Sequence, residues 1–231
     1  MTITIDDLVE RARGLRPVVA GHEQDGELDR RVADEVIDAI NGAGLFRIMT
    51  PKRYGGYETD IRTHLAVSAE IAKADAAAAW VTALTNVCAW VGGTFSNAAQ
   101  DEIWGENPDA RIAGVLAPTS MATPADGGLV VDGAWSFASG SLHAQWGIGG
   151  VPILSDTGDL IDQKVVCYRM SEVSIEDTWH TAGMRGTGSN TVVANDVFVP
   201  DHRMISVFQA LGGVYPTEHT DEVLYRSAMV P

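Results

Sequence analysis

The chain has 231 residues, of which 45% are hydrophobic and 20% are charged, and its formal net charge is −15. This length and apolar content are enough to bury a sizeable core, as one large domain or two modest ones. The excess of acidic residues disfavours nucleic acid and anionic membrane surfaces as partners, because either polyanion would be repelled.

The cysteines and the N-terminus bear on the cellular compartment, and the histidines bear on metal binding. Cys88 and Cys167 lie far apart in apolar runs, a pattern typical of buried thiols rather than of a disulfide framework. The N-terminus turns polar at once, without a basic and apolar leader or a span long enough to cross a bilayer. The histidines show no HxxxH or HExxH spacing and no CxxC motif accompanies them, so a metal site has no support. We expect a cytoplasmic protein without a dedicated metal.

Up to about residue 107 the apolar residues recur at helical spacing. The pattern predicts helices around residues 8–15 with Thr4 or Asp6 as N-cap, over 28–40 and ended by Gly42 and Gly44, over 61–73, over 80–91, and from Ser96 or Asn97 to Trp104. The helix around residue 85 is also rich in alanine on its other faces, which indicates burial on several sides.

After Pro108 the pattern changes to strands. We expect strands over 111–117, 146–154, 163–170, 173–176 and 191–199, and a hairpin over 129–137 that turns at Asp132-Gly133. A turn-rich segment, Ser155 to Asp159, separates two of these strands. No helical pattern interrupts them, so the sequence predicts an antiparallel sheet, a sandwich or a barrel rather than a parallel sheet flanked by helices.

The predicted fold class is therefore α+β in three segments. Residues 1–108 form an N-terminal α-helical domain, 109–206 a middle β-domain, and 207–231 a linker without an obvious element of its own.

Several segments resemble the acyl-CoA dehydrogenase superfamily in order and spacing. They are Gly44-Leu-Phe-Arg-Ile-Met-Thr-Pro-Lys-Arg-Tyr-Gly-Gly-Tyr57, Ala113-Gly-Val-Leu-Ala-Pro-Thr-Ser120, Trp135-Ser-Phe-Ala-Ser-Gly140, Leu142-His-Ala-Gln-Trp146, and the run from Asp177 to Asn190 that closes with Val197-Phe-Val-Pro200. The forms Trp-x-Phe-x-Ser-Gly and His-Ala-x-Trp look more like the two-component flavin-dependent monooxygenases of this superfamily than like its true dehydrogenases.

This resemblance implies a flavin site in the β-domain. An isoalloxazine ring needs apolar or aromatic walls and a few polar groups at its rim. The walls would come from Leu116, Trp135 and Phe137, and the rim hydroxyls from Thr119, Ser120, Ser139 and Ser141. Period-two spacing would also place Trp135 and Phe137 facing inward in any β-domain, so a purely structural role stays open.

Two further residues are candidates near the flavin. Arg185 lies in a glycine-rich loop, Gly183 to Asn190, which is either a ligand cradle or a flexible surface loop. His143 follows the Ser139-Gly-Ser141 segment and is a candidate base, or hydrogen-bond partner of a phenolate, although a lone histidine in a strand is more often structural. Ser139 and His143 are therefore the candidate catalytic residues.

The resemblance also implies the reaction and the partners. Such a protein takes reduced FMN or FAD from a separate flavin reductase and transfers one oxygen atom of O2 to an aromatic or polyketide-like small molecule. Relatives continue into a C-terminal helical bundle that completes the flavin site and mediates homo-oligomer assembly. The chain ends about where that bundle should begin, so we expect weak flavin affinity and an exposed apolar face on the β-domain.

Two alternatives remain open at this stage. One is an acyl-CoA dehydrogenase-type flavin oxidoreductase, in which a carboxylate removes the α-proton and the flavin takes hydride. The other is a non-catalytic binding subunit or inactive fragment that keeps the same fold.

Overall fold

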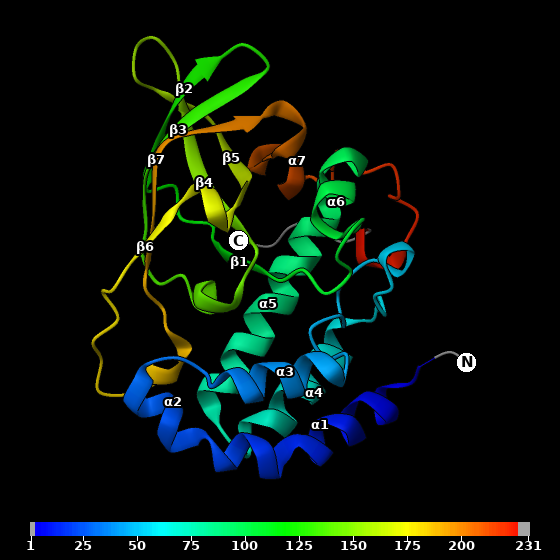
Figure 1. Ribbon diagram of the computed structural model, residues 1–231. Helices are drawn as coiled ribbons and strands as arrows, with labels where there is room; N and C mark the ends of the chain where they lie inside the picture. The colour runs from blue at the N-terminus through cyan, green and yellow to red at the C-terminus, as the bar shows by residue number, and fades with distance from the viewer. Residues whose placement is uncertain (1–2, 226–231) are drawn as a thin grey trace.

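A computed structural model describes residues 3–225 as a layer of helices joined to two β-sheets (Figure 1). The helices are α1 (Ile5–Gly21), α2 (Glu23–Asp29), α3 (Asp34–Gly42), α4 (Ile61–Ala72), α5 (Ala76–Thr94) and α6 (Asn97–Trp104). Strands β1 (Ile112–Val115), β2 (Ser120–Ala125), β3 (Gly128–Trp135), β4 (Trp146–Leu154), β5 (Leu160–Arg169), β6 (Ser174–Glu176), β7 (Thr191–Pro200) and β8 (Met204–Ser206) follow, and then α7 (Val207–Leu211). The predicted α+β class is confirmed.

The helix starts follow capping chemistry. Thr4 caps α1 in a reciprocal capping box with Asp7, and Asp60, Asp75 and Ser96 cap α4, α5 and α6 by accepting hydrogen bonds from first-turn amides. The predicted single helix over residues 28–40 is instead two helices, α2 and α3. The chain breaks at Arg30, whose φ of 56° is left-handed and cannot continue a right-handed helix.

The strands form two open four-stranded sheets, with orders β1-β4-β5-β8 and β2-β3-β7-β6. Every pairing is antiparallel except that of β1 with β4, which is parallel, so the expectation of a wholly antiparallel sheet is wrong at this pair. Neither sheet closes into a barrel within residues 3–225. The sheets share a core to which β3, β4, β5 and β7 contribute, which is the sandwich form of the prediction.

The predicted hairpin turn at Asp132-Gly133 is wrong. Residues 128–135 form one strand, and a register shift against β7 falls between Val131 and Gly133. The hairpin turn lies at another Asp-Gly pair, Asp126-Gly127, which joins β2 to β3. Both pairs meet the local requirement for a turn, but the apolar run of β3 continues through the second and stays paired with β7.

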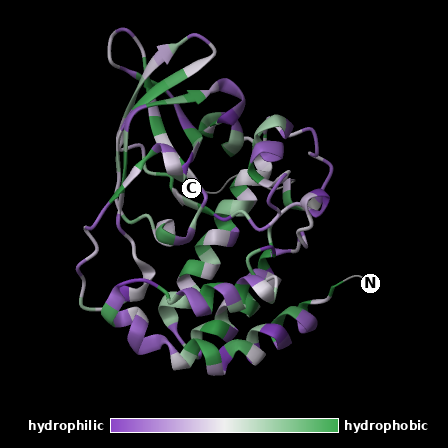
Figure 2. Cartoon of the chain, in the orientation of Figure 1, coloured by the Kyte–Doolittle hydropathy of each residue, from purple (hydrophilic) through white to green (hydrophobic). Residues whose placement is uncertain are grey.

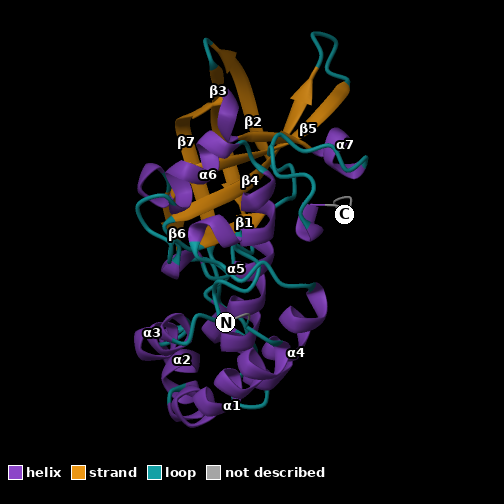
Figure 3. Cartoon of the chain, turned by 90° about the vertical axis from the view of Figure 1, so that its right-hand side faces the viewer, coloured by secondary structure: helices purple, strands orange, loops and turns teal. Residues whose placement is uncertain are grey.

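Helix α5 runs through the middle of the molecule, between the other helices and the first sheet (Figures 2 and 3). Gly92 of α5 and Gly114 of β1 allow close approach: a Cβ at Gly92 would lie 2.6 Å from Cδ1 of Ile112, and one at Gly114 would lie 3.0 Å from Sγ of Cys88. Helix α5 is long and apolar enough to cross a membrane, but 67% of its apolar 18-residue window is buried inside the fold. It is thus built as a core helix.

Both cysteines are buried and free, as predicted, and burial raises the pKa of each thiol to about 12. The segment expected to be a linker contains α7, and it buries Tyr215, Leu224 and Tyr225 in the core clusters. Residues 226–231 lie outside the described part of the chain. The division into domains at residue 109 stays a prediction.

Asn86 fixes the loop after α3 onto α5. Its side chain is fully buried; Oδ1 accepts from the amides of Ile48 and Met49 at 2.9 and 3.3 Å, and Nδ2 donates to the carbonyls of Leu45 and Thr82 at 2.8 and 2.9 Å. All four hydrogen-bonding positions of the amide are therefore used.

We expect Asn86→Ala to lower the free energy of unfolding by about 2 to 3 kcal/mol, because it leaves buried backbone groups without partners. Urea unfolding followed by circular dichroism measures this change. The matched control is Asn195→Ala at an exposed position of β7. Equal stability of the two variants would contradict the role of Asn86.

Candidate functional site

The N-terminal half of α5 supplies one side of a surface hollow. Asp75 fixes the start of the helix by accepting hydrogen bonds from the amides of Ala77 and Ala78 at 2.9 and 3.0 Å. Trp80 and Leu84 lie one turn apart on the same face of α5 and both line the hollow. Trp80 is 48% exposed. A large exposed indole on an otherwise buried helix indicates a surface meant to contact something else.

The segment after β3 supplies the second side. Phe137 is 70% exposed and adopts a left-handed φ of 67°, a strained conformation for an aromatic residue. The backbone that follows Phe137 is fixed, since the amide of Ala138 donates to the carbonyl of Asn190 at 3.0 Å and that of Gly140 donates to the carbonyl of Thr187 at 3.1 Å. The Phe137 ring is thereby held toward solvent at the hollow.

The loop from Asp177 to Asn190 supplies the third side, through Trp179 and Met184. Oδ1 of Asn190 accepts from the amides of Thr178 and Trp179 at 3.1 and 3.0 Å, and the Trp179 indole donates to the carbonyl of Met184 at 3.0 Å. The rings of Phe137 and Trp179 meet edge to face, with centroids 6.0 Å apart. The two aromatic walls support each other.

Two arginine contacts hold this loop on α2. The guanidinium of Arg30 pairs with both oxygens of Asp177 at 2.5 and 2.7 Å and donates to the carbonyl of Trp179 at 3.2 Å. Nε of Arg185 donates to the carbonyl of Glu27 at 2.7 Å. Bidentate pairing restricts orientation as well as distance, so the loop is positioned by the helical layer.

Together these three segments enclose a hollow of about 440 Å³. Its apolar lining consists of Trp80, Leu84, Phe137, Trp179 and Met184, and its hydroxyls are those of Ser139, Thr187 and Ser189. Aromatic walls with a few polar groups at one edge suit a flat heteroaromatic ring. The residues present therefore fit an isoalloxazine.

Of the residues predicted to bind flavin, Phe137 and Ser139 line this hollow. Trp135 does not: it is fully buried, stacks on Tyr168 with ring centroids 5.1 Å apart, and donates from Nε1 to the carbonyl of Gly150 at 3.0 Å. The predicted wall role of Trp135 differs from the structure because Gly149 leaves room for the indole in the core; a Cβ there would lie 2.4 Å from the ring.

The other predicted residues lie around the site in different settings. The hydroxyls of Ser120 and Thr119 donate to the carbonyls of Gly150 and Ala134 at 2.9 and 2.7 Å, so these residues stabilise strand ends instead of facing the hollow. Leu116 is 39% exposed beyond β1, and Ser141 is buried. Arg185 does not line the hollow but holds the loop that does. The flavin contacts predicted for these residues stay predictions.

His143 lies apart from the residues that line the aromatic hollow. It is buried, and its Nδ1 is 3.4 Å from the guanidinium of Arg31 and 3.7 Å from the carboxylate of Asp34. Burial and Arg31 lower its pKa to about 4, since both disfavour the imidazolium. This setting gives no direct contact with a ring bound in the hollow, and the predicted catalytic role of His143 stays a prediction.

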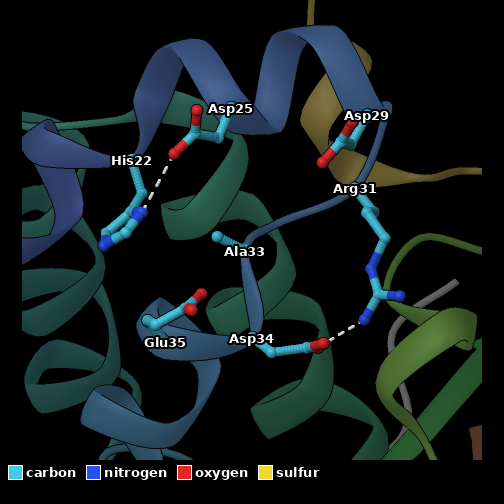
Figure 4. Close-up of a pocket in the computed structure, with 7 residues that line it drawn as sticks. All are labelled: His22, Asp25, Asp29, Arg31, Ala33, Asp34 and Glu35. Atoms are coloured by element: carbon cyan, nitrogen blue, oxygen red, sulfur yellow. Dashed lines mark hydrogen bonds and ion pairs between the residues drawn. The ribbon is translucent and has the colours of Figure 1, made fainter.

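A second hollow, of about 310 Å³, lies on the helical layer (Figure 4), and Arg31 and Asp34, the neighbours of His143, are among the residues that line it. Its lining is polar and mostly acidic: His22, Asp25, Asp29, Arg31, Ala33, Asp34 and Glu35. Arg31 is already paired with Asp34, and His22 with Asp25. Within residues 3–225 no group of three His, Cys, Asp or Glu side chains is arranged to hold a metal ion. This hollow lacks the aromatic walls of the first.

The sequence reading did not assign Trp80, Leu84, Trp179 and Met184 to the site. Helical periodicity predicted Trp80 and Leu84 as core, because α5 is apolar on nearly every face. Trp179 and Met184 lie in a loop, where no periodicity marks which side chains converge. The hydroxyls of Thr187 and Ser189 were noted only as part of a possible cradle.

Comparison with known proteins identifies the family. Residues 6–106 match the family "Acyl-CoA dehydrogenase, N-terminal domain". The "Flavin-dependent monooxygenase, oxygenase subunit HsaA" of Rhodococcus jostii (strain RHA1) is 36% identical over 206 residues, which cover 89% of this chain and 53% of that protein. The crystal structure of 3-HSA hydroxylase from Rhodococcus sp. RHA1 superposes with a TM-score of 0.92 at 34% identity, over 96% of this chain and 57% of that one.

The chain belongs to the acyl-CoA dehydrogenase fold superfamily. Its relatives include flavin-dependent monooxygenases, as the sequence resemblance implied. XiaF from Streptomyces sp., solved in complex with FADH2 and glycerol, superposes with a TM-score of 0.86 at 35% identity, over 97% of this chain and 57% of that one. The chain thus spans about half the length of the relatives it matches.

The low pKa of His143 predicts a pH dependence of stability. Between its ordinary pKa of 6.5 and about 4, the unfolded chain binds a proton that the folded chain does not. This contribution is complete above pH 6.5 and is lost as the pH falls toward 4. We expect the loss of stability from this group to reach ~3 kcal/mol at pH 4.

Urea unfolding of the wild type and of His143→Asn at pH 7.5, 5.5 and 4.5 measures this effect, because the difference removes what the carboxylates contribute in both proteins. The variant should lose less stability on acidification. Parallel loss in both proteins would show that His143 is not held neutral.

Proposed function

We propose that this chain carries the flavin-binding portion of the oxygenase component of a two-component monooxygenase. A separate flavin reductase supplies the reduced flavin, and the substrate is an aromatic or polyketide-like small molecule. The observation that carries the proposal is the aromatic hollow between α5, the segment after β3 and the loop 177–190. The relatives named as oxygenase subunits and hydroxylases support it.

When bound, the reduced flavin supplies the two electrons with which one oxygen atom of O2 enters the substrate and the other leaves as water. The chain's own residues supply the surroundings of the ring. Phe137 and Trp179 would flank it, Leu84 and Met184 would exclude water, and Ser139 would offer it a hydrogen bond. Exclusion of water matters because stray protons and water divert the oxygen to peroxide.

Between the two flavins we propose FAD. The support is the FADH2 bound to XiaF, a protein 35% identical to this chain. The cytoplasmic location and the homo-oligomer expected of a full-length protein stay predictions.

We expect Phe137→Ala to weaken flavin binding about tenfold, since it removes one aromatic wall. The measurement is a fluorescence titration of the chain with FAD and FMN, each in the oxidised and the reduced form. Phe137 is 70% exposed, so the substitution leaves the core intact. The matched control is Met121→Ala, which truncates a 73% exposed apolar residue on β2.

If Phe137→Ala and the wild type bound flavin with equal affinity, the hollow would not be the flavin site. A second result would redirect the proposal toward the dehydrogenase branch: anaerobic reduction of the bound oxidised flavin by an acyl-CoA.

A further inference from the structure

A row of hydrogen bonds runs behind the hollow. The Trp80 indole donates to Oγ of Ser139 at 3.1 Å, and Oγ of Ser139 is 2.6 Å from Oγ of Ser189. Oγ of Ser189 is 2.7 Å from Oγ1 of Thr187, which donates to the carbonyl of Met184 at 2.8 Å. The three hydroxyl residues are buried, with exposed fractions of 6%, 4% and 2% for Ser139, Ser189 and Thr187.

The chemistry of the two ends sets the direction of the whole row. An indole nitrogen can only donate and a carbonyl oxygen can only accept. Because the one hydroxyl hydrogen of Thr187 goes to Met184, Ser189 must donate to Thr187, and Ser139 must donate to Ser189. The row has four hydrogens for four hydrogen bonds, so all four form together only in this direction. If Thr187 donated to Ser189 instead, the hydrogen bond from its hydroxyl to the carbonyl of Met184 would be lost.

The carbonyl at the end of the row is fixed in place. Besides the Thr187 hydroxyl, it accepts from the Trp179 indole at 3.0 Å and from the Thr187 amide at 3.1 Å. Met184 itself has a left-handed φ of 56°, which aims its carbonyl back at the loop. The loop in turn is held on α2 by Arg30 and Arg185. The Met184 carbonyl, which sets the direction of the hydroxyl row, is therefore held in a fixed position.

Ser139 consequently meets the hollow as an acceptor. Its hydrogen is used toward Ser189, and the Trp80 indole occupies one of its two lone pairs, so the remaining lone pair is what it offers to a ligand. A ligand edge that carries an N–H is matched by this lone pair, whereas a bare ring nitrogen would face it lone pair to lone pair.

We propose that Ser189 and Thr187 are positioning residues that determine specificity by holding Ser139 as a hydrogen-bond acceptor, so that the site favours reduced over oxidised flavin. The inference rests on the proposed function, because the ligand in question is the flavin. The chemical basis is general: the reduced isoalloxazine carries N–H groups at ring positions where the oxidised ring has bare nitrogens.

The test is the ratio of the dissociation constants of oxidised and reduced FAD, measured by anaerobic fluorescence titration of this chain. Ser189→Ala removes the acceptor of the Ser139 hydrogen, which can then turn to a bare ring nitrogen. We expect the ratio to fall about fivefold, as the exchange of one buried hydrogen bond implies.

Variants of Thr187 separate the hydroxyl from general packing. Thr187→Val frees the Ser189 hydrogen to turn toward Ser139 and should lower the ratio similarly, whereas Thr187→Ser keeps the row and should restore the wild-type ratio. The matched control is Thr94→Val at the far end of α5, where a fully buried threonine also donates to a backbone carbonyl, that of Val91, at 2.7 Å. Its ratio should equal that of the wild type.

A ratio unchanged by both Ser189→Ala and Thr187→Val would overturn the inference. Failure of the wild type to bind either form of FAD would instead contradict the proposed function. The direction of the Ser139 hydroxyl hydrogen can then be tested without a ligand. Neutron diffraction from deuterium-exchanged crystals should place the Ser139 deuterium on the line to Ser189. A deuterium directed into the hollow would overturn the inference on its own.

Discussion

The structure depends on the burial of α5 on two opposite sides. One side packs in the helical core with Ile71 and Val67 of α4, and the other meets β1 so closely that Gly92 and Gly114 have no room for a side chain. A helix in this position cannot carry charged residues along its length, which is why it reads as apolar throughout. Its one buried amide side chain, Asn86, uses all four of its hydrogen-bonding positions. The helical layer and the first sheet are joined through this one element.

The hollow forms where one face of α5 reaches the surface of the protein. Near the N-terminal end of the helix, Trp80 faces outward, and the two loops that cover it come from residues more than fifty positions later in the chain. The walls are apolar, while the polar groups gather in a single buried row at one edge. Separating the two kinds of surface allows a flat ring to be held by contact and oriented by hydrogen bonds.

Much of the fold follows from sequence, and the exceptions have physical causes. Helical periodicity located α4, α5 and α6, the last with Ser96 as a predicted cap, and the strand pattern located β4 and β7. The predicted turn at Asp132-Gly133 has the same two residue types as Asp126-Gly127, yet only Asp126-Gly127 turns, because pairing with β7 keeps the other pair inside a strand. Of the two aromatic residues at the end of β3 and just beyond it, Phe137 reaches the hollow and Trp135 does not. That choice depends on the glycines of β4, a strand that sequence proximity does not connect to either ring.

The backbone at Phe137 and Met184 has a wider consequence. Both residues hold left-handed φ angles, which glycine would adopt with less strain. Both side chains line the hollow, so one wall of the site is built at a conformational cost that contacts elsewhere in the fold must offset.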